Sequence, residues 1–129
     1  MFKRVAAGML GALNILVGLT MLIAGERWFV TTPSVAATGP YNSHFVADVG
    51  AAFLAAGLAL LARSWRTRFW PAAVAGSTFL IFHGLIHVRD FFLHPHDLMS
   101  MLSVVVPSIL AMWAALPSKR DTDAELHRP

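Results

Sequence analysis

The sequence contains no cysteine and few charged residues. The absence of cysteine excludes disulfide bonds and thiolate metal sites. Charged residues make up 13% of the 129 residues, against roughly 25% in an average soluble domain, whereas apolar residues make up 57%. Such a chain has too few polar groups to cover a surface that faces water. The composition therefore indicates a protein surrounded by lipid.

Four apolar runs divide the sequence. Each has roughly the 20 residues that an α-helix needs to cross about 30 Å of hydrocarbon, whereas the strands of a membrane barrel would alternate apolar and polar residues. We therefore predict an all-α fold, an integral membrane four-helix bundle that forms a single domain over residues 1–117. The predicted helices cover residues 5–25, 44–62, 70–88 and 98–116, and the charged residues 118–129 are predicted to be a disordered tail.

The basic residues predict the orientation of this bundle. Lysine and arginine are enriched in the cytoplasmic segments of membrane proteins. Only Arg27 and Arg89 flank one predicted side of the membrane, and the other eight basic residues flank the opposite side: Lys3, Arg4, Arg63, Arg66, Arg68, Lys119, Arg120 and Arg128. Both termini and the 63–69 loop are therefore predicted to be cytoplasmic, in a bacterial inner membrane. Because the basic residues lie in short clusters between apolar runs, we expect no nucleic-acid partner despite the net charge of +3.

The first apolar run has a second interpretation, as a cleavable signal peptide that begins with Lys3 and Arg4. The run is longer than the 7–15 residues usual for the apolar part of a signal peptide, and no A-x-A pattern precedes Glu26. We therefore predict a transmembrane helix.

Three local features support the predicted helices. Asn42 or Ser43 can cap the second helix at its start. Pro107 lies in the middle of the fourth helix and predicts a kink there. The first two helices are rich in small residues, which allow helices to pack closely in lipid: Gly8, Gly11, Gly18, Gly50, Ala51, Ala55 and Gly57.

Most residues that can bind a metal or transfer a proton gather at the predicted outer face. They come from the end of the first helix, the start of the second, the end of the third and the following turn at 89–97: Glu26, His44, Asp48, His83, His87, Asp90, His94, His96 and Asp97. A chain with so few polar residues has therefore placed nearly all its candidate ligands on one side of the membrane.

The spacing of these residues predicts a shared pocket. His44 and Asp48 are four residues apart, as are His83 and His87, so each pair shares one face of a helix. Since the two helices run in opposite directions, His44 should be level with His87, and Asp48 with His83. The same face of the second helix continues with small residues, which suits an interior contact: Ala51, Ala52, Ala55 and Ala59.

The cost of burying a carboxylate gives this pattern a functional interpretation. An aspartate at bilayer depth costs about 2.5–3.5 kcal/mol, so such a residue is usually paired or functional. Imidazoles and carboxylates together bind iron, copper or zinc. We therefore predict a transition-metal site of His44, Asp48, His83 and His87, with Asp90 and Glu26 as outer ligands or proton acceptors.

Other interpretations of the same residues stay open. Histidines from two helices could bind haem b in an electron-transfer protein, in a slot lined by Phe45, Phe53, Phe79 and Phe82. Met99 and Met101 could add thioether ligands for copper. In a structural or assembly subunit, Asp48 would instead pair with a protonated His83 or with Arg89, and the His/Asp network would only hold two helices together.

Two resemblances accompany these motifs. The pairs HFVAD and HGLIH resemble the histidine boxes of membrane di-iron hydroxylases and desaturases. The longer stretch TGPYNSHFVADVGAAFLAAGLALL, followed by HGLIHV, resembles small four-helix bacterial membrane proteins of the DoxX-like group. This second resemblance implies a four-helix bundle in a bacterial inner membrane. DoxX-like proteins have been linked with quinone or sulfur redox chemistry, and no residue of this sequence carries that chemistry over.

Together these patterns predict a membrane protein that binds a transition metal at its periplasmic face. If the protein is an enzyme, the metal would activate water or oxygen for an oxidoreductase or hydrolase reaction on a small or lipid-soluble substrate. Asp48 or Glu26 would then act as the base. The lipid bilayer is the expected partner, and a homo-oligomer is compatible with the sequence.

Overall fold

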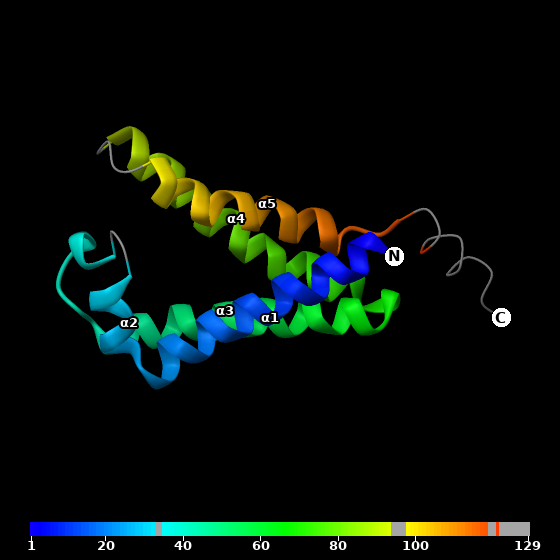
Figure 1. Ribbon diagram of the computed structural model, residues 1–129, viewed down its shortest axis with the longest axis horizontal. Helices are drawn as coiled ribbons and strands as arrows, with labels where there is room; N and C mark the ends of the chain where they lie inside the picture. The colour runs from blue at the N-terminus through cyan, green and yellow to red at the C-terminus, as the bar shows by residue number, and fades with distance from the viewer. Residues whose placement is uncertain (33–34, 94–97, 119–120, 122–129) are drawn as a thin grey trace.

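The chain is all-α in the part that the structure, a computed structural model, describes: residues 1–32, 35–93, 98–118 and 121. Its elements follow one another as two helical hairpins with short helices at the turns (Figure 1). They are α1 (Phe2–Ile23), α2 (Gly25–Thr31), the 3₁₀ helix η1 (Ala36–Thr38), α3 (Ser43–Trp65), the 3₁₀ helix η2 (Thr67–Phe69), α4 (Trp70–Leu93) and α5 (Leu98–Ala115).

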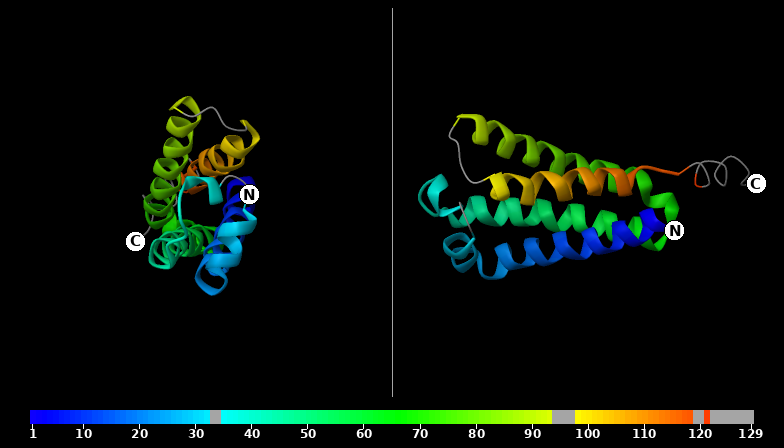
Figure 2. Two further views of the ribbon diagram at one scale, coloured as in Figure 1. Left: turned by 90° about the vertical axis from the view of Figure 1, so that its left-hand side faces the viewer. Right: turned by 45° about the horizontal axis from the view of Figure 1, so that its top comes forward.

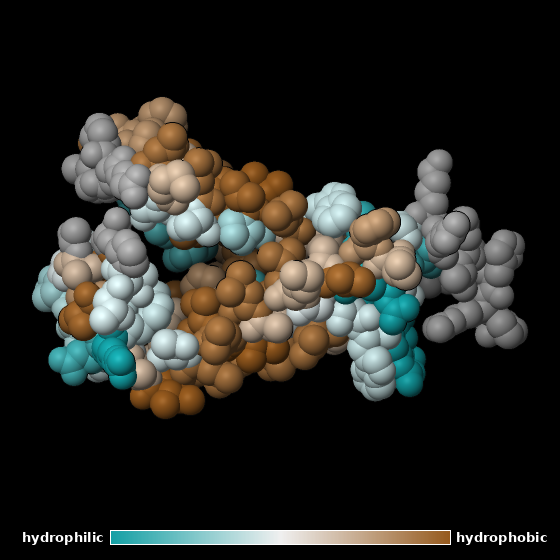
Figure 3. Space-filling view, viewed as in Figure 1, coloured by the Kyte–Doolittle hydropathy of each residue, from teal (hydrophilic) through white to brown (hydrophobic). Residues whose placement is uncertain are grey.

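The four long helices are long and apolar enough to cross a membrane. Large apolar side chains lie exposed on all four, among them Leu16, Leu58, Ile86 and Ile109. Apolar residues cover much of the length of the bundle in Figure 3. Exposed apolar surface of this extent is unfavourable in water, but it matches the hydrocarbon core of a bilayer. The structure thus confirms the predicted all-α fold with four membrane-compatible helices.

At one end of the bundle, the helix boundaries differ from the predicted ones in both connecting segments, 26–43 and 89–97. The 26–43 segment, predicted as a loop, contains α2 and η1. The third long helix continues past residue 88 to Leu93, so Arg89 and Asp90 are helical residues and do not belong to a turn. Asn42 caps α3, because its Oδ1 accepts a hydrogen bond from the backbone N–H of Phe45 at 3.0 Å, as predicted. We call this end of the bundle the α2 end and the opposite one the η2 end.

Glycines bring α1 and α3 into close contact. A Cβ on Gly18 would lie 2.6 Å from the carbonyl oxygen of Gly50, and a Cβ on Gly57 would lie 2.8 Å from that of Gly11. Each helix thus places two glycines seven residues apart at the same contact, with the helices antiparallel. This glycine contact (Gly11, Gly18, Gly50 and Gly57) confirms the predicted close packing of the first two long helices.

The two hairpins share a core at the η2 end and separate towards the α2 end. One apolar cluster joins all four long helices: Ala7, Ala56, Leu60, Ala73, Leu80, Ala111, Ala114 and Ala115. A second cluster at the α2 end contains Met21, Phe29 and Val46, and no residue of α4 or α5 among those described. Figures 1 and 2 show the α4–α5 hairpin diverging from the α1–α3 hairpin in that direction.

Candidate functional site

His83 lies where the two hairpins begin to separate. Its ring contacts Phe53 of α3 edge-on, with centroids 5.2 Å apart, and stacks against Phe79 one turn earlier on α4 at 5.8 Å. The two phenylalanine rings contact each other at 5.4 Å. Phe53 packs against both apolar clusters. These contacts hold the half-buried His83 ring in one place.

His87 lies one helical turn beyond His83, and the two imidazole rings are in contact. Their centroids are 4.9 Å apart, with an angle of 73° between the ring planes. Since metal–nitrogen bonds are about 2.0–2.1 Å long, two imidazoles on one tetrahedral ion have ring centres roughly 5 Å apart. The centroid separation of the observed pair is close to that value.

The end of α4 borders a hollow between the two hairpins. Figure 3 shows this hollow at the α2 end, on the left, with hydrophilic atoms visible in its depth. We call it the α2-end cleft.

His44 and Asp48 do not join the pair on α4. Their side chains contact each other at 3.5 Å and are 89% and 66% exposed. No three His, Cys, Asp or Glu side chains within the described ranges converge to hold a metal ion. The structure therefore does not assemble the predicted set of four ligands from α3 and α4.

The glycine contact explains the position of Asp48. Successive residues are about 100° apart around a helix, so Asp48 lies roughly 160° from Gly50 and 140° from Phe53. Gly50 faces α1 and Phe53 faces α4, which turns Asp48 away from both helices. Ala51 and Ala55 are exposed as well. Ala52 and Ala59 are half-buried, and Ala59 lies against Gly76 of α4, so only part of the predicted interior alanine face is an outer face of the bundle.

Of the other predicted ligands, Asp90 lies three residues beyond His87 on α4, within electrostatic range of its imidazole, whereas Glu26 lies on α2 and the rest lie outside the described residues. Glu26, in the first turn of α2, borders a depression of about 420 Å³ together with Arg27, Tyr41 and Ser43. Asp90 contacts the guanidinium of its neighbour Arg89 at 3.4 Å. Outside the described residues lie His94, His96 and Asp97.

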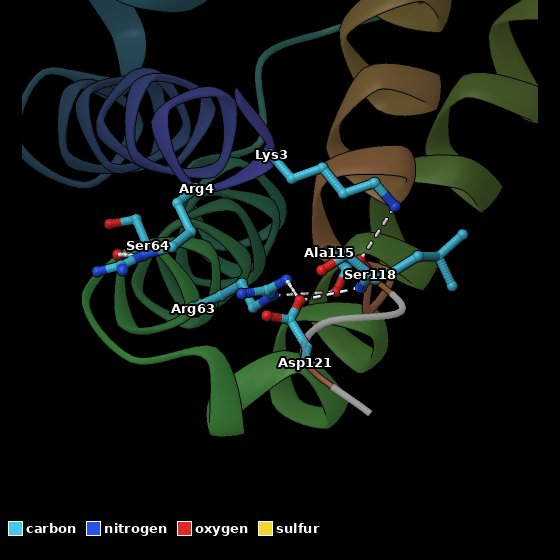
Figure 4. A network of polar contacts seen from close by, with 8 residues as sticks. Lys3, Arg4, Arg63, Ser64, Ala115, Ser118 and Asp121 are labelled. Carbon is cyan, nitrogen blue, oxygen red and sulfur yellow. Dashed lines mark hydrogen bonds and ion pairs between the residues drawn. The ribbon is translucent and has the colours of Figure 1, made fainter. Parts of the chain in front are cut away.

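One polar residue, which the sequence indicates only as a cation of the 63–69 loop, has the largest fully buried side chain among the described residues. Arg63 of α3 is 1% exposed. Its Nη2 donates to Asp121 Oδ2 at 2.7 Å, and its Nε donates to the Ala115 carbonyl at 3.4 Å (Figure 4). Asp121 Oδ2 also accepts from the backbone N–H of Ser118 at 2.9 Å. Asp121, in the segment predicted to be a charged tail, is therefore bound to Arg63 of α3.

Comparison of the chain with protein families, with curated proteins and with solved structures finds no match. The resemblance to DoxX-like proteins therefore stays a prediction from the sequence.

Proposed function

We propose that this chain is a multi-pass protein of a bacterial inner membrane, with its α2 end facing the periplasm. The proposal of a multi-pass membrane protein is supported by four helices, each of which is long and apolar enough to span a bilayer. The excess of basic residues at the η2 end supports the orientation. Because the chain has no cysteine, single-cysteine variants test it directly. A membrane-impermeant maleimide should label Tyr41→Cys, and not Thr67→Cys, in intact spheroplasts; the reverse pattern would contradict the orientation.

We further propose that His83 and His87 of α4 bind a transition-metal ion. The observation that carries this proposal is the contact between the two imidazoles, 4.9 Å apart on one face of α4. Two histidines four residues apart on a helix are an established metal-binding arrangement. Iron, copper and zinc all accept imidazole ligands. With two ligands from α4, the ion keeps open positions for water or for a substrate.

The geometry favours this metal site over haem b. The two axial ligands of a haem approach the iron from opposite faces of the ring, whereas His83 and His87 lie side by side on one helix. His44, the remaining described histidine, is 89% exposed. In the predicted slot, Phe45 and Phe82 are 65% and 62% exposed, whereas Phe53 and Phe79 have rings in contact with His83.

Elemental analysis of protein purified without chelators tests the metal proposal. We expect wild type to retain about one metal ion per chain, and His83→Ala and His87→Ala to lose it. His44→Ala is the matched control, because His44 is an exposed histidine that contacts a residue four positions further along its helix, Asp48. The proposal would be overturned if wild type and the three variants contained equal amounts of metal, or if none of them contained any. Loss of metal from His44→Ala alone would also overturn it. A wild-type protein that is stable without metal would indicate that the histidines only help to hold the helices together.

A further inference from the structure

A basic depression lies at the η2 end, far along the bundle from the histidine pair. It has a volume of about 340 Å³ and is lined by Arg4, Trp65, Arg66, Thr67 and Arg68. These residues come from the start of α1, the end of α3 and η2. Three arginines from two segments, the start of α1 and the turn between α3 and α4, thus border one depression.

Arg4 is held in place by backbone carbonyls. Its Nε donates to the carbonyl oxygen of Ser64 at 2.9 Å (Figure 4). Its Nη2 donates to the carbonyl oxygen of Trp65, also at 2.9 Å. These carbonyls belong to the last turn of α3, where helix carbonyls lack partners within the helix. Arg4 therefore connects α1 to the end of α3 and keeps its positive charge beside the depression.

The other two arginines lie over aromatic rings. The guanidinium carbon of Arg66 is 4.6 Å from the ring centroid of Trp65, and that of Arg68 is 5.0 Å from the ring centroid of Phe69. None of the ion pairs between described residues involves Arg4, Arg66 or Arg68. Stacking on aromatic rings orients the two guanidinium groups without neutralising them.

We propose that this depression binds the headgroup of an anionic phospholipid. Guanidinium groups match the geometry of a phosphate diester and bind its oxygens in pairs. Trp65 is 67% exposed, and tryptophan favours the boundary between headgroups and acyl chains. The depression therefore offers charge for the phosphate and an aromatic surface for the start of the acyl chains. A free phosphate ion would use only the first of these features.

Native mass spectrometry of the detergent-purified protein tests the proposal, with phosphatidylglycerol and phosphatidylcholine added in equal amounts. We expect wild type to retain phosphatidylglycerol preferentially. The variant Arg66→Gln/Arg68→Gln should lower that preference about 30-fold, since each basic residue near a lipid surface contributes to binding anionic lipid. Arg4 is left intact because it also connects two helices.

The matched control is Arg27→Gln/Arg89→Gln, which removes the same charge from the α2 end. The control variant should keep the wild-type preference. Equal losses in both double variants, or no loss in either, would overturn the proposal, because net charge or acyl contacts would then account for the binding. Displacement of the lipid by millimolar inorganic phosphate would also overturn it in favour of a free-anion site.

Discussion

Arg63 Nη2 and Asp121 Oδ2 form an ion pair 2.7 Å long between α3 and the segment that follows α5. The arginine is 1% exposed and the aspartate 13%. Arg63 Nη1 is buried and has no hydrogen-bond partner among the described residues. Asp121 is therefore the only carboxylate that balances the charge of this guanidinium within the described part of the chain. Loss of this carboxylate would leave a buried cation without a counter-ion.

We accordingly expect Asp121→Asn to destabilise the bundle by about 3 kcal/mol, since removal of one partner from a buried pair leaves an uncompensated charge. Reversible unfolding in detergent micelles measures the effect. Asp90→Asn is the control, because Asp90 pairs with Arg89, whose side chain is 71% exposed, and such a pair contributes about 1 kcal/mol at most. Equal destabilisation by the two variants would contradict the importance of the buried pair.

The same ion pair predicts a dependence of stability on pH. Partial burial acts to raise the pKa of Asp121, but hydrogen bonds from Ser118 and the nearby Arg63 outweigh it, and the pKa lies below its usual value. Because the folded-state pKa is lower than the unfolded value of about 3.9, this stabilisation is complete above that pH and is lost as the pH falls through the folded-state pKa. The difference in unfolding free energy between wild type and Asp121→Asn should therefore shrink below about pH 4. A difference that stays constant down to pH 2 would refute this account.

The glycine contact predicts a sharp difference between two glycines of α1. A methyl group on Gly18 would lie 2.6 Å from the Gly50 carbonyl oxygen and 2.7 Å from the Leu54 backbone nitrogen, so the helices would have to separate. A methyl group on Gly8 would meet only Ser64 side-chain atoms at 3.4 Å. We expect Gly18→Ala to cost about 1–3 kcal/mol and Gly8→Ala to be neutral or stabilising, because alanine favours a helix. Similar unfolding free energies for the two variants would show that α1 and α3 can separate without cost.

The sequence predicted the helices better than it predicted which face of each helix is buried. Apolar runs report helix length, since hydrocarbon thickness sets it. In lipid, however, the outer face of a helix is as apolar as the inner one, so hydropathy does not distinguish them. His44 and Asp48 therefore seemed to face His83 and His87. The seven-residue spacing of Gly50 and Gly57 was the available signal that these residues face elsewhere.

The η2 end shows a second limit of prediction from the sequence. Arg63 follows an apolar run and belongs to a basic cluster, which is typical of a residue at the membrane surface. Its burial depends on Asp121, which is 58 residues further along the chain. No local pattern indicates a contact between such distant residues. The sequence therefore identifies Arg63 as an orientation signal, and the structure adds that it connects α3 to Asp121, in the segment after α5.

The contacts of His83 allow its packing to be separated from its proposed role as a ligand. Phenylalanine at this position would keep the edge-on contact with Phe53 and the stacking on Phe79, but it has no nitrogen to bind a metal. We expect His83→Phe to change the unfolding free energy by less than about 1.5 kcal/mol and to remove the bound metal. Paired measurements of unfolding and metal content on one preparation would test both parts. Retention of metal by His83→Phe would exclude this residue as a ligand, whereas strong destabilisation would mean that the imidazole itself, through a polar contact at the α2-end cleft, holds the two hairpins together.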